Sequence, residues 1–409
     1  MRKLFSLIVL ATLATACTNT TKQNDEQLLK QALELHESII TIDSHTDTPL
    51  LLTRENFDFN GSNNESRGKV TLKKMEEGKL DAAFFAVFIG QDDRNPNKYD
   101  EVHNRALSIF ESIHKSTKKH SDRSAVATSP SDAEKLKKEG KRAIYIGVEN
   151  GYPIGKDITR LEQYYDLGAR YLTLSHTRNN DICDSSTDPN GPEHNGLSSF
   201  GRKVVKKLNR LGMMIDVSHI SDDAFNQVLE HTQMPIIASH SNARAICNHP
   251  RNLNDEMLKK LAQNGGVIQV CLLSSYVKES EPQPKRDSAR NALRDKYNNF
   301  QNLSPEVREK AVDEWYALDE KFPPILATVS DLVDHIDHIV ETIGIDYVGI
   351  GSDFDGGGAI EGCFDAGEMT NITVELLRRG YSKEEIQKIW GGNFLRVFRE
   401  VERFAQNHK

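Results

Sequence analysis

Apolar residues along this chain gather in short runs that end in polar residues and are followed by segments with helical spacing. Eight such runs are present, at residues 39–47, 80–90, 143–150, 169–177, 212–220, 234–241, 265–273 and 346–354. Helical patterns such as residues 160–168 and 201–212 lie between them. Near-continuous apolar strands that alternate with helices are typical of a parallel sheet covered on both faces. Eight such units predict an α/β fold, a closed (β/α)8 TIM barrel. An open doubly wound sheet is the alternative.

The segments outside this repeat complete the predicted domain. Residues 26–40 have helical spacing and lead into the first strand. The connection at about 274–330 is highly charged and far longer than an ordinary connection between a strand and a helix. We expect a partly helical insertion there, over the barrel mouth or at a subunit contact; a solvated surface excursion is the alternative. After the last strand we expect two closing helices, the second beginning at Asn393. Residues 31–409 are thus predicted to form a single domain.

The first 17 residues have the pattern of a targeting segment. Arg2 and Lys3 precede an apolar run that is too short to span a bilayer as a helix, which is typical of a secretory signal. Residues 14–16 are small and directly precede Cys17, as in a bacterial lipobox, although Leu13 lies one position further from the cysteine than usual. We therefore predict a signal peptide at 1–17, a tether at 18–30 and an exported cell-envelope lipoprotein on the periplasmic face or the cell surface. An ordinary signal peptide with an incidental cysteine is the alternative.

Composition narrows the possible partners. The 409 residues carry a net charge of −8, which makes nucleic acid a poor partner because its phosphates attract basic surfaces. Four further cysteines, Cys183, Cys247, Cys271 and Cys363, lie far apart without a C-x-x-C pair. They are therefore not predicted metal ligands, and the sequence does not determine whether they form disulfides.

Ionisable residues end most of the predicted strands. In a (β/α)8 barrel the active site lies at the carboxyl ends of the strands. His45 and Asp47 are two positions apart, so in an extended strand they project to the same side. The ends of the later strands carry Glu149, His176, His219, His240, Asp353 and Asp355. A single histidine at such a place is usually a core or loop residue, but four histidines and three carboxylate-bearing strand ends on one face predict a metal centre.

The residue types limit the metal. Imidazole and carboxylate without thiolate suit zinc or a similar divalent ion. The set is too large for one tetrahedral ion, whereas two ions about 3.5–4 Å apart that share a carboxylate would use it. Glu149 comes from the middle of the set and is the natural bridge. Asp43 is expected to accept hydrogen bonds behind the ligands, and Asp355 to cap the next helix.

The chain resembles the membrane dipeptidase family, peptidase family M19, and the matching motifs cover most of the chain. These motifs are DSHTD (43–47), GVENG (147–151), YLTLSHTRNN (171–180), IDVSH (215–219), SHSNARAICNHPRN (239–252), GIGSDFDG (349–356) and GGNFLRVF (391–398). The resemblance implies a metal-dependent hydrolase barrel that cleaves dipeptides, including those with a C-terminal D-residue. It also implies a homodimer. Where the family often has GVEGG this chain has Asn150, which we expect to reshape the pocket edge while the neighbouring carboxylate stays in place.

The resemblance also implies a role for each site residue. His45 and Asp47 would bind the first of two zinc ions, and His219 and His240 the second, with Glu149 and a water or hydroxide bridging both. His176 would contact the substrate and stabilise the tetrahedral intermediate. Arg251 would hold a polar or carboxylate group of the substrate. Asp353 would transfer the proton from the attacking water to the leaving amine.

Two other functions remain open from the sequence. One is a different dinuclear amidohydrolase, such as an N-acyl amino acid deacylase. Such barrels commonly begin with H-x-H and use a carboxylated lysine, whereas this chain has H-x-D and Glu149. The other is a substrate-binding lipoprotein without catalysis, which would not need the complete set of ligands.

Overall fold

A computed structural model describes residues 25–62, 68–300 and 303–408, so the predicted signal peptide and Cys17 lie outside the described residues. Within them, one parallel sheet has the order β1-β2-β4-β5-β6-β7-β8-β9, with β3 paired to β4. The strands are β1 (Ile42–Thr46), β2 (Ala82–Phe88), β3 (Ser124–Val126), β4 (Arg142–Glu149), β5 (Ala169–Thr173), β6 (Met214–Asp216), β7 (Ile237–Ala238), β8 (Val267–Val270) and β9 (Val348–Ile350).

The two ends of this sheet meet at the carboxyl ends of β1 and β9. Thr46 forms a parallel bridge with Phe354. The amide of Asp47 donates to the carbonyl of Phe354 at 2.8 Å, and the amide of Asp353 donates to the carbonyl of His45 at 3.0 Å. The eight strands of the main path therefore form a nearly closed barrel, as predicted, and the open sheet is excluded.

β3 is a strand that the sequence pattern did not predict. Its three residues pair with Arg142–Ile144 of β4. β5 begins to pair with β4 only at Ile146. β3 therefore lies along the first part of β4, outside the eight-stranded path.

Aromatic side chains fill the barrel beneath the carboxyl ends of its strands. The Phe84 ring stacks on the rings of Tyr145 and Tyr171, with centroids 4.8 and 5.3 Å apart. Phe394 and Phe398 of α16 (Asn393–Asn407) meet Phe84 edge to face. This part of the barrel is thus packed, and chemistry is confined to the carboxyl ends of the strands.

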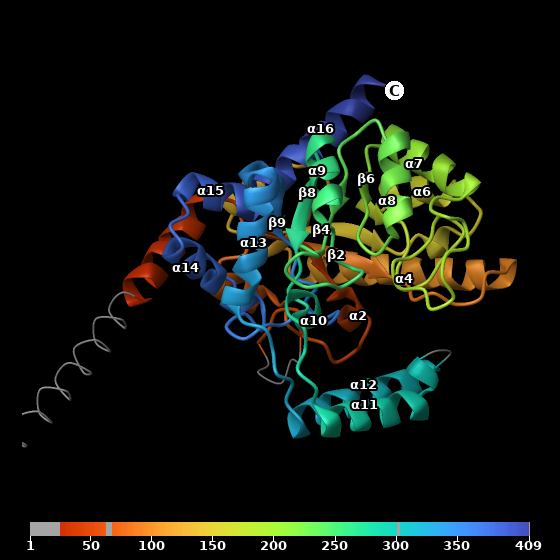
Figure 1. The fold of residues 1–409 in the computed structure, drawn as a ribbon, viewed down its shortest axis with the longest axis horizontal. Coiled ribbons are helices and arrows are strands. Elements are labelled where there is room, and N and C mark those ends of the chain that lie inside the picture. The colour runs from red at the N-terminus through yellow and green to blue at the C-terminus, as the bar shows by residue number, and fades with distance from the viewer. Residues whose placement is uncertain (1–24, 63–67, 301–302, 409) are drawn as a thin grey trace, which may run out of the picture.

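Helices cover the outside of the barrel, and α2 and α10 lie at its mouth (Figure 1). A helix also covers residues 25–38, and so includes residues 25–30 of the predicted tether. Besides α16, the labelled helices are α2 (Pro49–Leu52), α3 (Leu72–Glu77), α4 (Pro96–Lys119), α5 (Asp132–Lys138), α6 (Arg160–Asp166), α7 (Ser199–Leu211), α8 (Asp222–His231), α9 (Asp255–Gln263), α10 (Ser274–Val277), α11 (Pro284–Lys296), α12 (Pro305–Lys321), α13 (Val329–Ile343), α14 (Thr370–Arg378) and α15 (Lys383–Gln387).

The segment at 274–330 contains the helix pair α11 and α12, which lies apart from the barrel on the side of α2 and α10 (Figure 1). Its base is held by bonds within the segment. Gln283 donates to the carbonyl of Pro323 at 3.2 Å and accepts from the amide of Ile325 at 3.3 Å. Arg286 of α11 forms an ion pair with Asp319 of α12 at 2.8 Å.

The closing helices differ in one respect from the prediction. α15 continues through a π-helical segment, Lys388–Gly392, into α16. α16 thus begins at Asn393, as predicted, but it follows the π-helical segment without a break. The side-chain amide of Asn393 donates to the carbonyls of Ile345 and Val348 at 2.7 and 2.8 Å, which ties the helix to β9.

Two further properties bear on the predictions. Cys183, Cys247, Cys271 and Cys363 are free thiols, and all four are buried. In the part of the chain that the structure describes, every helix is too short or too polar to cross a bilayer.

Candidate metal centre and active site

Glu149 is the last residue of β4 and lies at the centre of the predicted ligands. Its Oε1 lies 3.1 Å from Nε2 of His219, 3.5 Å from Nε2 of His240 and 3.7 Å from Nε2 of His176. Its Oε2 lies 3.7 Å from Nε2 of His45. One carboxylate thus faces four imidazoles that come from four different strand ends, and its two oxygens divide the site into two halves.

The first half contains His45 and two further carboxylates. Nε2 of His45 lies 3.8 Å from Oδ2 of Asp47. His45, Asp47 and Asp353 each place one possible ligand atom within 4.8 Å of the others. Nε2 of His45 and Oδ1 of Asp47 are buried and have no hydrogen-bond partner. Buried polar atoms without partners are rare and costly, so these atoms indicate a missing ligand.

The second half contains His219 and His240. Their Nε2 atoms lie 2.8 Å apart, and His176 joins His219 and Glu149 in another possible ligand group. His219 follows β6 and has a backbone φ of 74°, in the left-handed region. Its ring faces Glu149 from this position. Two ring nitrogens that converge on one carboxylate oxygen form an arrangement that a bound cation would satisfy.

The electrostatics of the cluster also favour a cation. Burial and repulsion from Asp47 raise the pKa of Glu149 well above its usual value. The same two causes raise the pKa of Asp353 to about 7. Burial alone would lower the pKa of His45, but Glu149, Asp47 and Asp353 raise it to about 10. Buried carboxylates that repel each other need a compensating positive charge, and a divalent ion supplies it.

The remaining histidines are held neutral, as ligands require. Burial, and then the positive charge of Arg251, lower the pKa of His176 to about 3. Burial lowers the pKa values of His219 and His240 well below the usual range. Neutral imidazoles beside carboxylates, without thiolate, form a donor set that fits zinc or a similar ion.

Side chains behind the ligands fix their rings. Nδ1 of His45 forms a hydrogen bond with the hydroxyl of Tyr171 at 2.8 Å, so Nε2 faces the cluster. A Cβ at Gly147 would collide with the Tyr171 ring, so only glycine leaves room for that ring. On the other side, Nδ1 of His240 lies 2.8 Å from Oγ of Ser239, which donates to Asp216 at 2.7 Å.

Asp43 and Asp355 support the backbone of the site. Asp43 accepts from the amides of Ser352 at 2.8 Å and His45 at 3.2 Å, which joins β1 to the loop after β9 and agrees with its expected acceptor role. The expected helix cap at Asp355 is wrong. Its carboxylate accepts instead from Thr48 at 2.7 Å and from the amide of Lys69 at 2.8 Å, because its φ of 66° turns the chain back across the mouth.

Arg251 and His176 lie at the edge of the cluster. Arg251 is 2% exposed, and its guanidinium donates to the carbonyl of His240 at 3.1 Å and to Oγ of Ser241 at 3.4 Å. It also lies over the ring of Tyr276 at 5.3 Å. The side chain of His176 is 20% exposed and packs on Phe88, with ring centroids 4.6 Å apart. Of the cluster, His176 is therefore placed to meet a molecule that enters from solvent.

Asn150 does not lie at the edge of the pocket, where we expected it. It is fully buried with a φ of 72°. Its amide donates to the carbonyl of Ile89 at 2.9 Å and accepts from Asn180 at 3.0 Å. It therefore ties together the segments that follow β2, β4 and β5 and does not form the pocket edge.

Sequence reasoning missed the residues that orient the ligands: Tyr171, Ser239 and Asp216. Tyr171 is an aromatic residue within a strand, Ser239 precedes a ligand, and Asp216 ends β6 three positions before His219. The position of Asp216 in IDVSH was the one available signal. The contacts of all three depend on the register of neighbouring strands, which a single sequence does not show.

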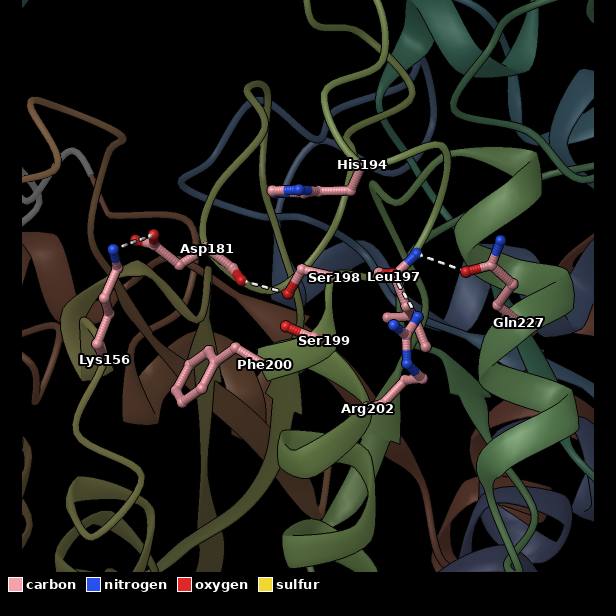
Figure 2. Close-up of a pocket in the computed structure, with 9 residues that line it drawn as sticks. All are labelled: Lys156, Asp181, His194, Leu197, Ser198, Ser199, Phe200, Arg202 and Gln227. Atoms are coloured by element: carbon pink, nitrogen blue, oxygen red, sulfur yellow. Dashed lines mark hydrogen bonds and ion pairs between the residues drawn. The ribbon is translucent and has the colours of Figure 1, made fainter.

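A pocket of about 600 Å³ lies elsewhere, at the amino end of α7 (Figure 2). Its lining includes Lys156, Asp181, His194 and Arg202, and none of the predicted site residues. Figure 2 shows Lys156 pointing toward Asp181, and Ser198 bonded to the backbone of the same residue. The polar groups of this pocket thus largely satisfy one another.

Comparison with known proteins agrees with the geometry of the cluster. The family model for membrane dipeptidases matches residues 29–409. Dipeptidase 3 of Rattus norvegicus is 32% identical over 394 residues, which cover 94% of this chain and 69% of that protein. Dipeptidase tcpJ of Claviceps purpurea is 32% identical over 347 residues, 84% of this chain and 71% of that protein.

Solved structures show the same fold. The probable dipeptidase PvdM from Pseudomonas aeruginosa is 33% identical, with a TM-score of 0.78 over 93% of this chain and 100% of that chain. A metallopeptidase from Rhodobacter sphaeroides, solved with a phosphinate mimic of the dipeptide L-Ala-D-Ala, is 22% identical, with a TM-score of 0.70 over 89% of this chain and 99% of that chain. This chain belongs to the membrane dipeptidase family, peptidase family M19, and is a metallopeptidase.

Proposed function

We propose that this protein is a zinc-dependent dipeptidase with two zinc ions per chain, bridged by Glu149. One observation carries the proposal: three overlapping groups of possible ligand atoms join seven side chains from six strand ends, and Glu149 belongs to two of these groups. His45 and Asp47 would hold one ion, and His219 and His240 the other. Bound there, the ions would lower the pKa of a shared water and polarise the scissile carbonyl.

The chain's own residues complete the reaction. Asp353 is buried beside Asp47, where its carboxylate could accept the proton of the attacking water and return it to the leaving amine. His176 is neutral and reaches solvent, so its ring can donate a hydrogen bond to the developing oxyanion. Arg251 would bind the carboxylate of the substrate and orient it.

A free carboxylate near the scissile bond distinguishes a dipeptide from a longer peptide. The guanidinium of Arg251 is buried, and its Nε has no hydrogen-bond partner. Such a group favours an anionic substrate end and would leave an uncharged substrate poorly bound. We include dipeptides with a C-terminal D-residue among the substrates, such as L-Ala-D-Ala, whose mimic the Rhodobacter sphaeroides structure contains.

The cellular location and the oligomeric state of the protein are further parts of the proposal. We propose export through the segment at 1–17, lipid attachment at Cys17 and a homodimer on the periplasmic face or the cell surface. Labelling with radioactive palmitate tests the anchor, because wild type should incorporate it and Cys17→Ala should not. Sedimentation of the chain lacking residues 1–17 tests the dimer.

Hydrolysis assays with metal analysis on the same sample test the central proposal. The substrates are L-L and L-D dipeptides, a tripeptide and an N-acetyl amino acid. We expect about two zinc per chain and turnover of dipeptides alone. Glu149→Gln should abolish activity and reduce the zinc content, whereas Glu193→Gln, at a half-exposed ion pair with Arg94, should change neither.

Two outcomes would contradict the proposal. Bound zinc with activity only on the N-acetyl amino acid would make the protein a deacylase on the same barrel. Turnover of L-L dipeptides with inactivity on L-Ala-D-Ala would remove the D-residue substrates and leave the dipeptidase activity.

A further inference from the structure

Asp216 is a fully buried carboxylate that lies behind the candidate ligands. It ends β6, and four donors surround it. Its Oδ1 accepts from the amides of Ser218 at 3.0 Å and Ser239 at 2.9 Å. Its Oδ2 accepts from the hydroxyls of Thr173 and Ser239, the latter at 2.7 Å. With four donors, this carboxylate acts only as an acceptor.

These bonds determine which atom donates in the hydrogen bond between Ser239 and His240. The single hydroxyl proton of Ser239 is used in its bond to Asp216. The oxygen of Ser239 also lies 2.8 Å from Nδ1 of His240, so it must accept a proton from that nitrogen. His240 therefore carries its proton on Nδ1. Its Nε2 then carries a lone pair within the cluster, 2.8 Å from Nε2 of His219 and 3.5 Å from Oε1 of Glu149.

The imidazoles of the other two candidate ligands, His219 and His45, lack such a relay, meaning a hydroxyl that links the ring to a buried carboxylate. Nδ1 of His219 is buried without a hydrogen-bond partner. Nδ1 of His45 meets the Tyr171 hydroxyl, which can donate or accept. Among these three, the hydrogen bonds fix the tautomer only for His240.

We propose that Ser239 and Asp216 are positioning residues that set the tautomer and orientation of His240 for metal binding. The proposal rests on the dinuclear site proposed above. A carboxylate joined to a ligating histidine through a hydroxyl raises the ligand's affinity for the metal and fixes its ring. Removing the hydroxyl should weaken the ion held by His219 and His240 more than the ion held by His45 and Asp47.

The test compares Ser239→Ala with wild type and with Ser239→Thr, which retains the hydroxyl. Zinc affinity is measured by competition with a chelator, and cobalt-substituted protein is followed by its visible absorption spectrum. We expect Ser239→Ala to bind one of its two zinc ions roughly 10- to 100-fold more weakly and to show an altered cobalt spectrum. Ser239→Thr should restore both properties. Thr173→Val is the matched control, because it removes the other hydroxyl from Asp216 and leaves the bond between Ser239 and His240.

A purely structural role predicts a different pattern. Ser239→Ala would then lower the unfolding temperature of the metal-free protein, while the folded protein would keep its zinc affinity and cobalt spectrum; this outcome overturns the proposal. If Ser239→Ala does not fold, nitrogen-15 spectra of histidine-labelled wild type decide the question. The signal that is lost in His240→Asn must show a proton on Nδ1, and a proton on Nε2 in the metal-free protein overturns the proposal.

The same samples separate this inference from the proposed function. If wild type binds zinc but hydrolyses no dipeptide, the proposed function fails while the ratio of zinc affinities still tests the relay. If wild type hydrolyses dipeptides and Ser239→Ala binds both ions as wild type does, the relay fails and the proposed function stands.

Discussion

Gly356 shows how closely the backbone approaches the carboxylates at the scale of one residue. A Cβ built on it would collide with Oδ2 of Asp47 and Oδ1 of Asp353. Because the clashing atoms are candidate ligand and proton-transfer atoms, relief of the clash must displace them. We predict that Gly356→Ala loses dipeptidase activity by at least about 100-fold and retains less zinc on dialysis, since small displacements of reacting groups have effects of this size.

Gly90→Ala is the control for this substitution. Gly90 has a negative φ, and its nearest outside atom would lie 3.9 Å from the new Cβ. The Gly90→Ala variant should therefore keep wild-type activity and zinc content. Wild-type zinc binding and activity in Gly356→Ala would show that the loop after β9 can move away from Asp47 and Asp353, against the close packing described here.

His36 ties the helix at residues 25–38 to the closing helices. Its Nε2 forms a hydrogen bond of 2.7 Å with Thr373 of α14, and its ring meets Trp390 edge to face at 4.7 Å. Trp390 donates to the same Thr373 hydroxyl at 2.6 Å. Burial, with the positive charge of Lys137, lowers the pKa of His36 to about 4.

This shift predicts a loss of stability in acid. Between pH 6.5 and about 4 the unfolded chain binds a proton at residue 36 and the folded chain does not. The free energy of unfolding should therefore fall through this range, by up to about 3 kcal/mol from this one group. Urea unfolding of metal-free protein at several pH values measures the effect. The free energy of unfolding of His36→Gln should fall less steeply with decreasing pH than that of wild type. His408→Gln, which changes an exposed residue, is the control and should behave as wild type. Equal slopes for wild type and His36→Gln would contradict the prediction.

The elements show what the sequence could and could not predict. All eight barrel strands were predicted, because a buried parallel strand is an apolar run and each run ends in polar residues. β3 was missed because three residues carry no recognisable pattern. The ligands were predicted from their places at strand ends, and the structure brings them together. Ser239 and Asp216 were not, because their effect on His240 depends on which residues of β6 and β7 are opposite each other.

At the scale of the whole molecule, the helix pair α11 and α12 forms a unit that can be removed without breaking the barrel, as its contacts indicate. Gln283 and Ile325 lie within hydrogen-bond distance, so the base of the segment is narrow. Ion pairs between Arg286 and Asp319 and between Lys296 and Glu314 join the two helices to each other. We predict that a short Gly-Ser linker in place of residues 284–322 leaves a folded barrel that binds zinc as wild type does.

The ends of this connection are adjacent, so shortening it changes the closure entropy little. The candidate metal ligands all come from strand ends of the barrel, which the replacement leaves intact. Zinc content and the unfolding temperature measure the outcome, and the same linker inserted after Gly140, on an open surface, is the control. If the shortened protein precipitates or loses zinc while the control does not, the helix pair stabilises the barrel. If it keeps its zinc but sediments as a smaller particle than wild type, the helix pair supports the subunit contact and not the metal centre.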